Sequence, residues 1–340
     1  MKEFILYGAV PDKECEDYIT GYTGGGMLVG YVDSNPAKRD ETKGVYSPEL
    51  IAKHKDATVV IMSDKIKEIA TFIRDSGWNN EILVFPHLRS TWCDRNQNEL
   101  RNWCAENKSK LFSVYENDDY TTGLLQEMLI ERASDTFSFV PLERVIDFSH
   151  INLYFYDKEI APKGDITLVN GGAYTGDSIE EIFLAYGDRL KKVYAFEPDS
   201  ENMSALKVRM NKLGIANIVE NVLAGMSDHE DKIAFSGGES MASAFLGNGE
   251  ESVPIVTIDS VVKEVAGELC INMDVEGFEV PAIKGAKDCI LKYHPYLAIC
   301  VYHKMGDFLD VPMAIKSIRD DYKFYLRSGA HPECYAVPIR

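Results

Sequence analysis

Short apolar runs alternate with amphipathic stretches in the first quarter of the chain. The runs have the length and composition of buried β-strands and lie at residues 3–8, 27–33, 58–62 and 81–85. In the segment 65–75, apolar residues recur at the i, i+3, i+4 and i+7 spacing of a helix. Apolar strands that alternate with helices favour right-handed βαβ units and a parallel sheet. We therefore expect residues 1–88 to form a small Rossmann-like N-terminal domain.

The glycine pattern of this domain departs from the one that binds dinucleotides. The fingerprint G-x-G-x-x-G would begin at Gly8, but Val10 and Lys13 replace its other two glycines. Losing the second glycine places a side chain where the backbone would meet a pyrophosphate. Asp33 follows the second strand, where a ribose-binding acid belongs, although an aspartate there often only starts a turn. We therefore expect a docking or substrate-shaping domain rather than a nucleotide-binding one.

The alternation of strands and helices stops after residue 88 and resumes near Pro162. We expect residues 89–160 to form a helical joint and residues 161–340 to form a second α/β domain. Its candidate strands are 165–170, 191–197, 217–220, 269–274, 296–303, 323–328 and 333–337. Helical segments separate the first five, whereas the last strands follow with little between them. This order predicts a largely parallel sheet that ends in an antiparallel pair and binds its ligand at the carboxyl ends of the strands.

Composition and net charge indicate a globular protein and disfavour nucleic-acid-binding and membrane proteins. The 340 residues are 45% hydrophobic and 26% charged, which is typical of a globular protein, and the formal net charge is −18. This negative charge disfavours binding to nucleic-acid phosphates and to anionic membrane surfaces. The sequence contains no run of about 18 apolar residues that could span a membrane. Its seven cysteines form no C-x-x-C pair, which fits a reducing compartment and predicts a cytoplasmic protein.

The segment "LVNGGAYTGD" at residues 168–177 leads from an apolar strand through glycines into a helix. Small residues at 171–173 let the main chain approach a ligand, and the amide groups of this loop can face a cofactor. Ser178 and Glu181 have the spacing of a capping box, so we expect the helix to begin here. An acidic residue often closes the strand before such a loop, but Asn170 stands there instead.

A carboxylate follows at the tip of the next predicted strand. Glu197 ends that strand and Pro198 stops it. A carboxylate in this place can accept two hydrogen bonds from the hydroxyls of a ribose. Neither strand tip has a basic residue close in sequence, which favours an adenosine-type ligand without phosphates. A purely structural turn is the alternative interpretation of the glycine loop.

Five segments of the second half lie in the order and spacing of the FkbM-like family of S-adenosylmethionine-dependent methyltransferases. They are "NGGAYTGDS", "VYAFEPD", "VTIDSV", "INMDVEGFEVPAIKGA" and "YLAICVYHK", and the chain resembles the family over about residues 150–340. The first half is similar to the degenerate Rossmann-like domain that precedes the catalytic domain in some bacterial members.

The resemblance implies a class I methyltransferase-like Rossmann sheet and S-adenosyl-L-methionine as cofactor. It also implies O-methylation of a hydroxyl on a sugar, glycan or secondary metabolite. The cofactor-binding residues that the resemblance implies are Gly172, Ala173, Gly176, Asp177 and Glu197. Beside them we expect Asn170, Gly171, Thr175 and Pro198 at the same site.

Two positions depart from the pattern of that family. Asn170 stands where the family usually has an aspartate, and Asn272 stands where a lysine is common before "MD". An asparagine can accept a hydrogen bond but brings no charge to offset the ammonium or sulfonium of the cofactor. We therefore hypothesise a weakened affinity for S-adenosylmethionine. Calorimetric titration of the Asn170→Asp variant tests this hypothesis, and an unchanged affinity would remove it.

Candidate catalytic residues follow the fourth and fifth predicted strands of the second domain. Asp274 and Glu276 lie at the first tip, and His303 and Lys304 lie at the second. Methyl transfer from a sulfonium needs an aligned oxygen and a base that removes its proton. Asp274 or His303 is the expected base, and Lys304 could meet an acidic group of the substrate. In the structural alternative, Asp274 caps a loop and His303 is a satisfied histidine at a strand end.

Other interpretations stay open from the sequence. Asp274, Glu276 and Glu279 could hold a divalent cation, but their spacing is not an established one and we expect no metal. A cofactor-binding sensor or scaffold without turnover, and a NAD-dependent dehydrogenase, are the alternative functions. The segment 235–249 is either a lid over the acceptor or a surface loop. We expect a small-molecule or glycan substrate, no nucleic-acid or membrane partner, and leave a homodimer open.

Overall fold

The chain forms two compact units in the computed structural model. The first unit comprises residues 1–106 and 126–150, and the second comprises residues 107–125 and 151–340. Among the described residues, no helix combines the length and the apolar character needed to cross a membrane. The structure describes residues 2–8, 16, 20, 25–63, 66–84, 97–119, 121–122, 125, 140–141, 155, 160–235, 251–328 and 332–340.

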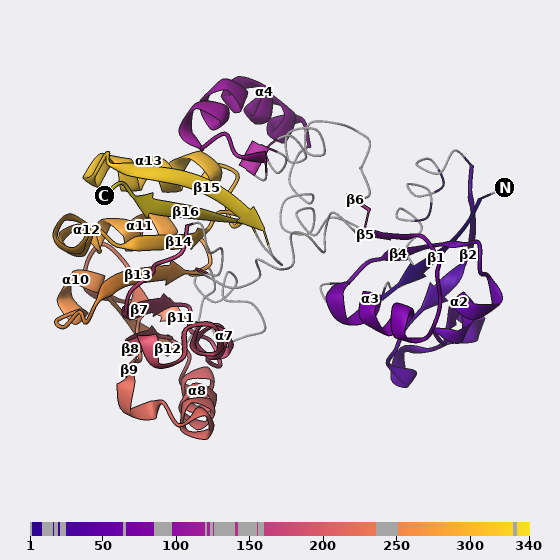
Figure 1. The fold of residues 1–340 in the computed structure, drawn as a ribbon, viewed down its shortest axis with the longest axis horizontal. Helices are drawn as coiled ribbons and strands as arrows, with labels where there is room; N and C mark the ends of the chain where they lie inside the picture. Colours follow the sequence, from indigo (N-terminus) through magenta and orange to yellow (C-terminus); the bar gives the residue numbers. More distant parts are fainter. Residues whose placement is uncertain are drawn as a thin grey trace. The chain divides into compact units, whose positions relative to one another are not determined.

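The first unit is built on a six-stranded sheet with the strand order β3-β2-β1-β4-β5-β6 (Figure 1). Its neighbouring strands are parallel except for β5 and β6, which are antiparallel. This order confirms the predicted Rossmann-like arrangement and its four predicted strands. The elements are β1 Glu3–Tyr7, β2 Met27–Val32, β3 Val45–Tyr46, α2 Glu49–Lys53, β4 Thr58–Ile61, α3 Ile66–Asp75, β5 Ile82–Val84 and β6 Val140–Pro141.

Two features of this unit bear on the question of nucleotide binding. Asp33 lies just beyond β2, and its Oδ1 accepts a hydrogen bond from the amide of Asn35 at 2.8 Å, which is the turn-starting role considered above. The other fingerprint positions, Val10 and Lys13, lie outside the described residues. The sequence pattern does not predict β3 or α2, because two and five residues are too few to show a period.

The described part of residues 89–160 is shared between the two units. Helix α4 (Gln97–Val114) belongs to the second unit from Asn107 onward. Tyr115, directly after this helix, is buried and donates a hydrogen bond to the Phe308 carbonyl at 2.7 Å. Strand β6 instead pairs with β5 in the first unit. Long-range contacts therefore divide this region, and the local sequence pattern carries no signal of such contacts.

The second unit contains a seven-stranded sheet with the order β15-β16-β14-β13-β7-β8-β9. Five strands are parallel, whereas β16 runs antiparallel to both of its neighbours. The predicted parallel sheet with a terminal antiparallel pair is therefore confirmed. The strands are β7 Ile166–Gly171, β8 Leu190–Phe196, β9 Val219–Val222, β13 Glu268–Met273, β14 Tyr296–Cys300, β15 Tyr322–Ser328 and β16 Pro332–Pro338.

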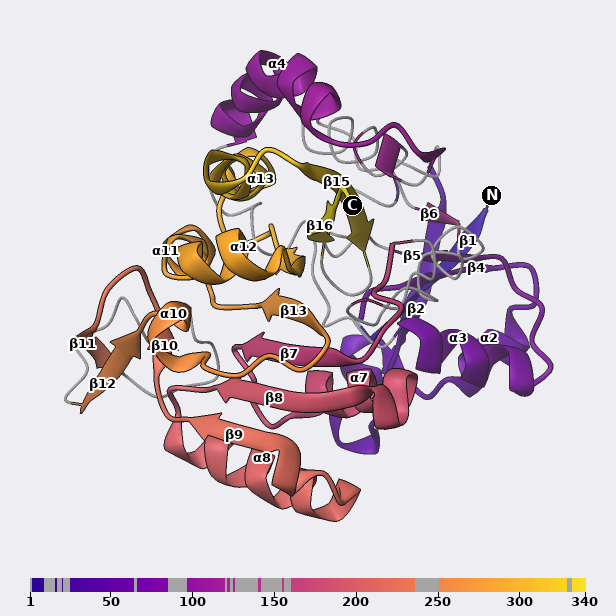
Figure 2. The ribbon, with the colours of Figure 1, turned by 60° about the vertical axis from the view of Figure 1, so that its left-hand side comes forward.

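Helices cover both faces of this sheet. Helices α7 and α8 lie on one face and α10 to α13 lie on the other (Figures 1 and 2). The apolar side of α7 packs into the core, with Ile179 and Ile182 fully buried. The winding of the chain reverses between β7 and β13, which places a ligand crevice at the carboxyl ends of these two strands. The helices are α7 Asp177–Tyr186, α8 Ser200–Leu213, α10 Ile258–Val261, α11 Glu279–Lys284, α12 Lys287–Tyr293 and α13 Asp307–Ile318.

A small three-stranded sheet, which the sequence pattern does not predict, lies between β9 and β13 in the chain. It consists of β10 (Gly225–Met226), β12 (Glu251–Val256) and β11 (Asp231–Phe235), in that order (Figure 2). The glycine- and serine-rich segment expected at 235–249 begins at the end of β11, and its residues 236–249 lie outside the described part of the chain.

Candidate active site

The glycine loop follows β7 where the winding of the sheet reverses. Gly172 has a left-handed backbone with φ of +72°, and a Cβ there would lie 1.9 Å from the Asp274 carbonyl oxygen. The loops after β7 and β13 thus touch through their backbones, which only glycine allows. The amides of Gly172 and Ala173 donate to the Phe196 carbonyl at 3.1 and 2.9 Å. These two amides of the loop therefore join it to β8 instead of facing a cofactor.

Helix α7 begins directly after this loop, but without the predicted capping box. Its N-cap is Gly176, with φ of +84°, and no side chain caps it. Ser178 lies inside the helix, and its Oγ accepts a hydrogen bond from Asn170 Nδ2 at 2.9 Å. The capping role of Ser178 with Glu181 is therefore wrong, since the hydroxyl points to the strand. Asp177 occupies the first turn, where the helix dipole favours a carboxylate.

The two departures from the family pattern lie side by side. Asn170 of β7 and Asn272 of β13 are opposite one another in the sheet, and both are buried. Asn170 Nδ2 donates to Asn272 Oδ1 at 2.6 Å. Because the same Nδ2 also donates to Ser178, the Asn170 amide group is occupied by contacts to the sheet and to α7.

Glu197 lies at the tip of β8, as predicted, and is fully buried. Its Oε2 accepts the amide of Tyr174 at 2.8 Å, and its Oε1 accepts the amide of Asp199 at 2.9 Å. Burial raises the pKa of Glu197, while hydrogen bonds from these amides and from Asn202 act in the opposite direction. The carboxyl group therefore ties the glycine loop to the segment after β8, and each of its oxygens has further acceptor capacity.

A pocket opens beyond the tips of β7, β8 and β13. It encloses about 320 Å³, including space open to solvent, and its walls are largely apolar. An apolar lining is typical of sites for small ligands. The lining residues are Gly172, Phe196, Pro198, Ala224, Gly225, Met226, Ile255, Val275 and Phe278.

Some of the predicted cofactor residues surround this pocket. Gly172 and Pro198 line it, and Glu197 directly precedes Pro198. Gly171 supports the wall, because a Cβ at this position would lie 2.6 Å from the sulfur of Met226. The structure therefore brings these four predicted residues together from two separate strand tips.

Other predicted residues lie outside the pocket lining. Gly176 packs against Met210 of α8, and the Thr175 hydroxyl lies 3.5 Å from the Arg209 guanidinium. The sequence reasoning missed the lining residues Ala224 to Met226, Ile255 and Phe278. Most of these come from β10 and β12, whose short segments give no clear periodic signal.

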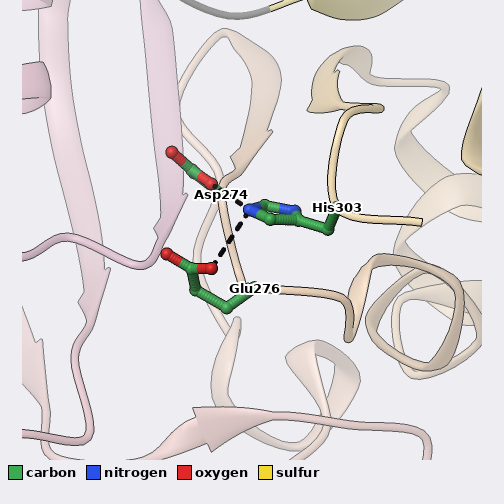
Figure 3. A group of neighbouring side chains, drawn as sticks. All are labelled: Asp274, Glu276 and His303. Carbon is green, nitrogen blue, oxygen red and sulfur yellow. Dashed lines mark ion pairs between the residues drawn. The ribbon is translucent and has the colours of Figure 1, made fainter. Parts of the chain in front are cut away.

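A cluster of two carboxylates and a histidine lies at the tips of β13 and β14 (Figure 3). His303 Nε2 is 3.3 Å from Asp274 Oδ1 and 3.3 Å from Glu276 Oε2. Figure 3 shows both carboxyl groups directed at the same ring nitrogen. Glu276 has a left-handed backbone with φ of +53°, which is uncommon for a residue other than glycine. The three residues predicted as catalytic from two separate strands thus meet.

Glu279 fixes the other side of the histidine ring. Its Oε1 lies 2.8 Å from His303 Nδ1 and accepts the amides of Val275 and Gly277 at 3.1 and 3.3 Å. Glu279 lies in the first turn of α11 and is fully buried, at 0% exposure. Its carboxylate holds the loop after β13 and contacts the ring at the same time.

Tyr302 and Lys304 flank the histidine. The Tyr302 hydroxyl lies 3.1 and 3.3 Å from the two oxygens of Asp274, and therefore donates to that carboxylate. The Lys304 ammonium donates to the Gly277 carbonyl, and the Lys304 amide donates to Asp307 Oδ2 at 2.7 Å. The lysine expected to meet an acidic substrate thus closes the loop after β13 in this structure.

The carboxylates change the protonation behaviour of the cluster. Burial alone would lower the pKa of His303, but Asp274 and Glu279 outweigh this effect and raise it to about 10. Burial raises the pKa of Glu276, against the attraction of the imidazolium. Burial and the charge of Glu279 raise the pKa of Asp307 to about 7. Without a ligand, His303 is therefore protonated at neutral pH and is not a free base.

Comparisons with known proteins agree with this arrangement. The family model described as "Methyltransferase FkbM domain" matches residues 170–324. The crystal structure of methyltransferase FkbM from Methylobacillus flagellatus KT covers 99% of this chain and 90% of its own, with 19% identity and a TM-score of 0.58. No curated protein sequence matches the chain.

Two further solved structures are similar to somewhat more than half of the chain. A putative methyltransferase from Streptococcus mutans, in complex with SAH, covers 57% of this chain and 97% of its own, at 16% identity and a TM-score of 0.35. A SAM-dependent methyltransferase from Aquifex aeolicus covers 58% and 98%, at 15% identity and a TM-score of 0.34.

The family match spans the parts of the molecule that form the candidate site. It begins at Asn170 and includes the glycine loop, the tip of β8 and the carboxylate–histidine cluster. The likeness to the Methylobacillus flagellatus protein shows the same fold. Residues 170–324 of this chain therefore match the methyltransferase FkbM domain.

Proposed function

We propose that the protein is an S-adenosylmethionine-dependent O-methyltransferase that acts on a hydroxyl of a sugar, glycan or secondary metabolite. One observation carries the proposal: the apolar pocket and the carboxylate–histidine cluster share a single loop. Val275 lines the pocket, and its two chain neighbours, Asp274 and Glu276, belong to the cluster. A methyl donor in the pocket would thus lie beside groups that can accept a proton.

The pocket supports an adenosyl ligand. Its apolar walls, which include Phe196 and Phe278, suit the flat face of an adenine. Glu197 directly follows Phe196 and offers carboxylate oxygens to the ribose hydroxyls. The described lining contains no basic side chain, so it favours a cofactor without phosphates over NAD. S-adenosylmethionine combines these features.

The cluster supports proton removal from the acceptor. In the reaction, the methyl carbon leaves the sulfonium sulfur for the acceptor oxygen, and the electron pair of the broken C–S bond stays on sulfur. The hydroxyl proton passes to a carboxylate, for which we assign Asp274. Tyr302 orients this carboxylate through its hydroxyl. His303, whose pKa is raised to about 10, serves as a charged partner rather than as the base.

The remaining expectations about partners and location belong to the same proposal. The net charge of −18 favours a small-molecule or glycan acceptor over nucleic acid. Five described cysteines are free and buried, which supports a reducing, cytoplasmic environment. The first unit is assigned to docking or substrate shaping, and a homodimer stays open.

Thermal unfolding with candidate ligands tests the cofactor. S-adenosylmethionine and S-adenosylhomocysteine should each stabilise the full chain, by about 2.7 kcal/mol at a hundredfold excess over Kd, whereas NAD and a UDP-sugar should not. Formation of S-adenosylhomocysteine with a panel of hydroxylated acceptors tests turnover. Cofactor binding without product from any acceptor would favour a sensor or scaffold. Stabilisation by NAD alone would contradict the proposal.

A further inference from the structure

The spacing of the cluster at the tips of β13 and β14 matches that of ligands around one metal ion. One donor atom each from Asp274, Glu276 and His303 lie within 4.8 Å of one another. The two nitrogen–oxygen separations are both 3.3 Å. Ligands at about 2.0–2.2 Å from a shared ion stand roughly 2.8–3.6 Å apart in octahedral or tetrahedral geometry. The observed separations fall inside this interval.

The histidine ring lacks hydrogen bonds where they would be expected. The His303 side chain is only 7% exposed. Neither of its ring nitrogens makes a hydrogen bond of acceptable geometry to any described residue, although carboxylate oxygens lie close to both. A buried polar group that is left unsatisfied calls for an additional partner such as an ion. Nε2 is the ring atom that Figure 3 shows directed at the two carboxylates.

Glu279 orients the ring as metal-binding histidines are oriented. It contacts Nδ1 at 2.8 Å from the opposite side, and amides of Val275 and Gly277 hold it in place. A carboxylate at one ring nitrogen keeps the proton there and leaves the other nitrogen free to bind a metal. The cluster therefore differs from a simple group of acidic residues, because it contains a histidine with a carboxylate at Nδ1 and with Nε2 directed at two further carboxylates.

We propose that Asp274 Oδ1, Glu276 Oε2 and His303 Nε2 bind a divalent cation, with Glu279 as the positioning residue for the histidine. Binding releases the Nε2 proton, so the ion replaces the charge of the imidazolium, and Asp274 Oδ2 stays available to accept the acceptor proton. Two carboxylates and one imidazole are a mixed oxygen and nitrogen set, which suits Mn²⁺ or a similar transition ion better than Ca²⁺. The sequence alone leads to the expectation of no metal, because Asp274, Glu276 and Glu279 do not have an established ligand spacing. The structure supplies His303 as the third ligand.

The site also indicates a class of acceptor, an inference that rests on the proposed function. Three protein ligands leave further positions on the ion open. An acceptor with two neighbouring oxygens, such as a vicinal diol or an α-hydroxy acid, could fill two of them. The ion would then lower the pKa of the bound hydroxyl beside the methyl donor. Val275 lines the adenosyl pocket and lies between Asp274 and Glu276 in the chain, so the proposed ion site and the pocket share one loop.

Mn²⁺ titration of the full chain, freed of metal with a chelator, tests the site directly. Electron paramagnetic resonance of free Mn²⁺ should show one saturable site per chain. Asp274→Asn, Glu276→Gln and His303→Gln should each raise Kd by at least about tenfold, and Glu279→Gln should raise it by about tenfold through the ring orientation. Asp320→Asn, which alters an exposed acid outside the cluster, should leave Kd unchanged.

The outcomes separate this inference from the proposed function. Thermal unfolding in chelator shows whether each variant folds. If Asp274→Asn does not fold, the Kd of Glu276→Gln is compared with that of wild type instead. The Glu276 side chain is 25% exposed, so its substitution disturbs the core less. No saturable Mn²⁺, or equal Kd values in wild type and cluster variants, would overturn the site. Calorimetric titration with S-adenosylmethionine in the presence of chelator measures cofactor binding independently of the metal. The proposed function can therefore be tested even if the metal site is absent.

Product formation tests the acceptor class. With a metal site present, S-adenosylmethionine should be converted to S-adenosylhomocysteine when vicinal diols or α-hydroxy acids are supplied as acceptors with Mn²⁺. This conversion should fall at least about tenfold in chelator. Equal turnover of isolated alcohols in chelator would overturn the acceptor assignment while leaving the methyltransferase function intact.

Discussion

Asn170 Nδ2 donates a hydrogen bond to Asn272 Oδ1 across β7 and β13 at 2.6 Å, and both side chains are buried. The resemblance to the FkbM-like family leads us to expect an aspartate and a lysine at these two positions. The two departures therefore form one coupled change, in which a neutral amide pair occupies the place of an opposite-charge pair. A neutral pair avoids the desolvation of two buried charges.

The first prediction concerns this pair. Asn170→Asp should destabilise the protein by about 3 kcal/mol at pH 8, because it buries a carboxylate without a charged partner. The double variant Asn170→Asp with Asn272→Lys should recover most of this loss. Urea unfolding of the single and double variants measures both effects. Equal stability of the two variants would show that the positions are not coupled.

The same variants test the affinity hypothesis. Calorimetric titration with S-adenosylmethionine should show tighter binding in the double variant than in wild type if a charge at position 170 matters to the cofactor. An unchanged affinity would show that the Asn170 amide serves the packing of β7, β13 and α7 instead.

The second prediction concerns the loop contact at Gly172. Gly172→Ala should cost clearly more than about 1 kcal/mol of unfolding free energy, because the new Cβ meets the Asp274 carbonyl in addition to the strain of a left-handed backbone. Gly214→Ala is a matched control, with φ of +74° and no atom within 4 Å of the added Cβ. It should lose only about 1 kcal/mol. Similar losses in both variants would contradict the close approach of the two loops.

The third prediction concerns Glu197. Burial raises its pKa above 4.5, so its contribution to folding is fully present below pH 4.5 and is lost as the pH rises through the folded-state pKa. Cofactor binding has the opposite sign, because ribose hydroxyls need the carboxylate. The affinity for S-adenosylmethionine should therefore fall on acidification, starting above pH 4.5.

Glu197→Gln tests this account. The amide should weaken cofactor binding by at least about tenfold, since its NH₂ group faces the amides of Tyr174 or Asp199 and repels them. Its affinity should also lose the pH dependence. Calorimetry between pH 4.5 and 8 measures both, and a wild-type pH profile in the variant would exclude Glu197 as the titrating group.

The fourth prediction separates chemistry from cofactor binding. Asp274→Ala should abolish turnover, with a loss of at least about 100-fold, because it removes the assigned base. His303→Ala should also abolish turnover, because it removes the group that both carboxylates face. The Kd of S-adenosylmethionine should stay within about threefold in both, since neither side chain lines the pocket. Full activity of both variants would refute the assignment.

The sequence by itself determined the elements that depend on local pattern. Apolar runs predicted most strands of the six-stranded and the seven-stranded sheet, because a buried parallel strand is apolar along its length. The spacing of Ile179 and Ile182 predicted the buried face of α7. Glu197 and Asp274 could be placed at strand tips because the carboxyl ends of parallel strands share one edge of a sheet.

Only the tertiary structure decided which side chains meet. Asn170 and Asn272 are 102 positions apart, and their pairing depends on the register of β7 against β13. His303 reaches Glu276 and Glu279 because β14 lies next to β13, and a single sequence carries no measure of that proximity. The protonation of the histidine follows from burial and from carboxylates on another strand. These contacts are long-range, so they depend on packing and not on local sequence pattern.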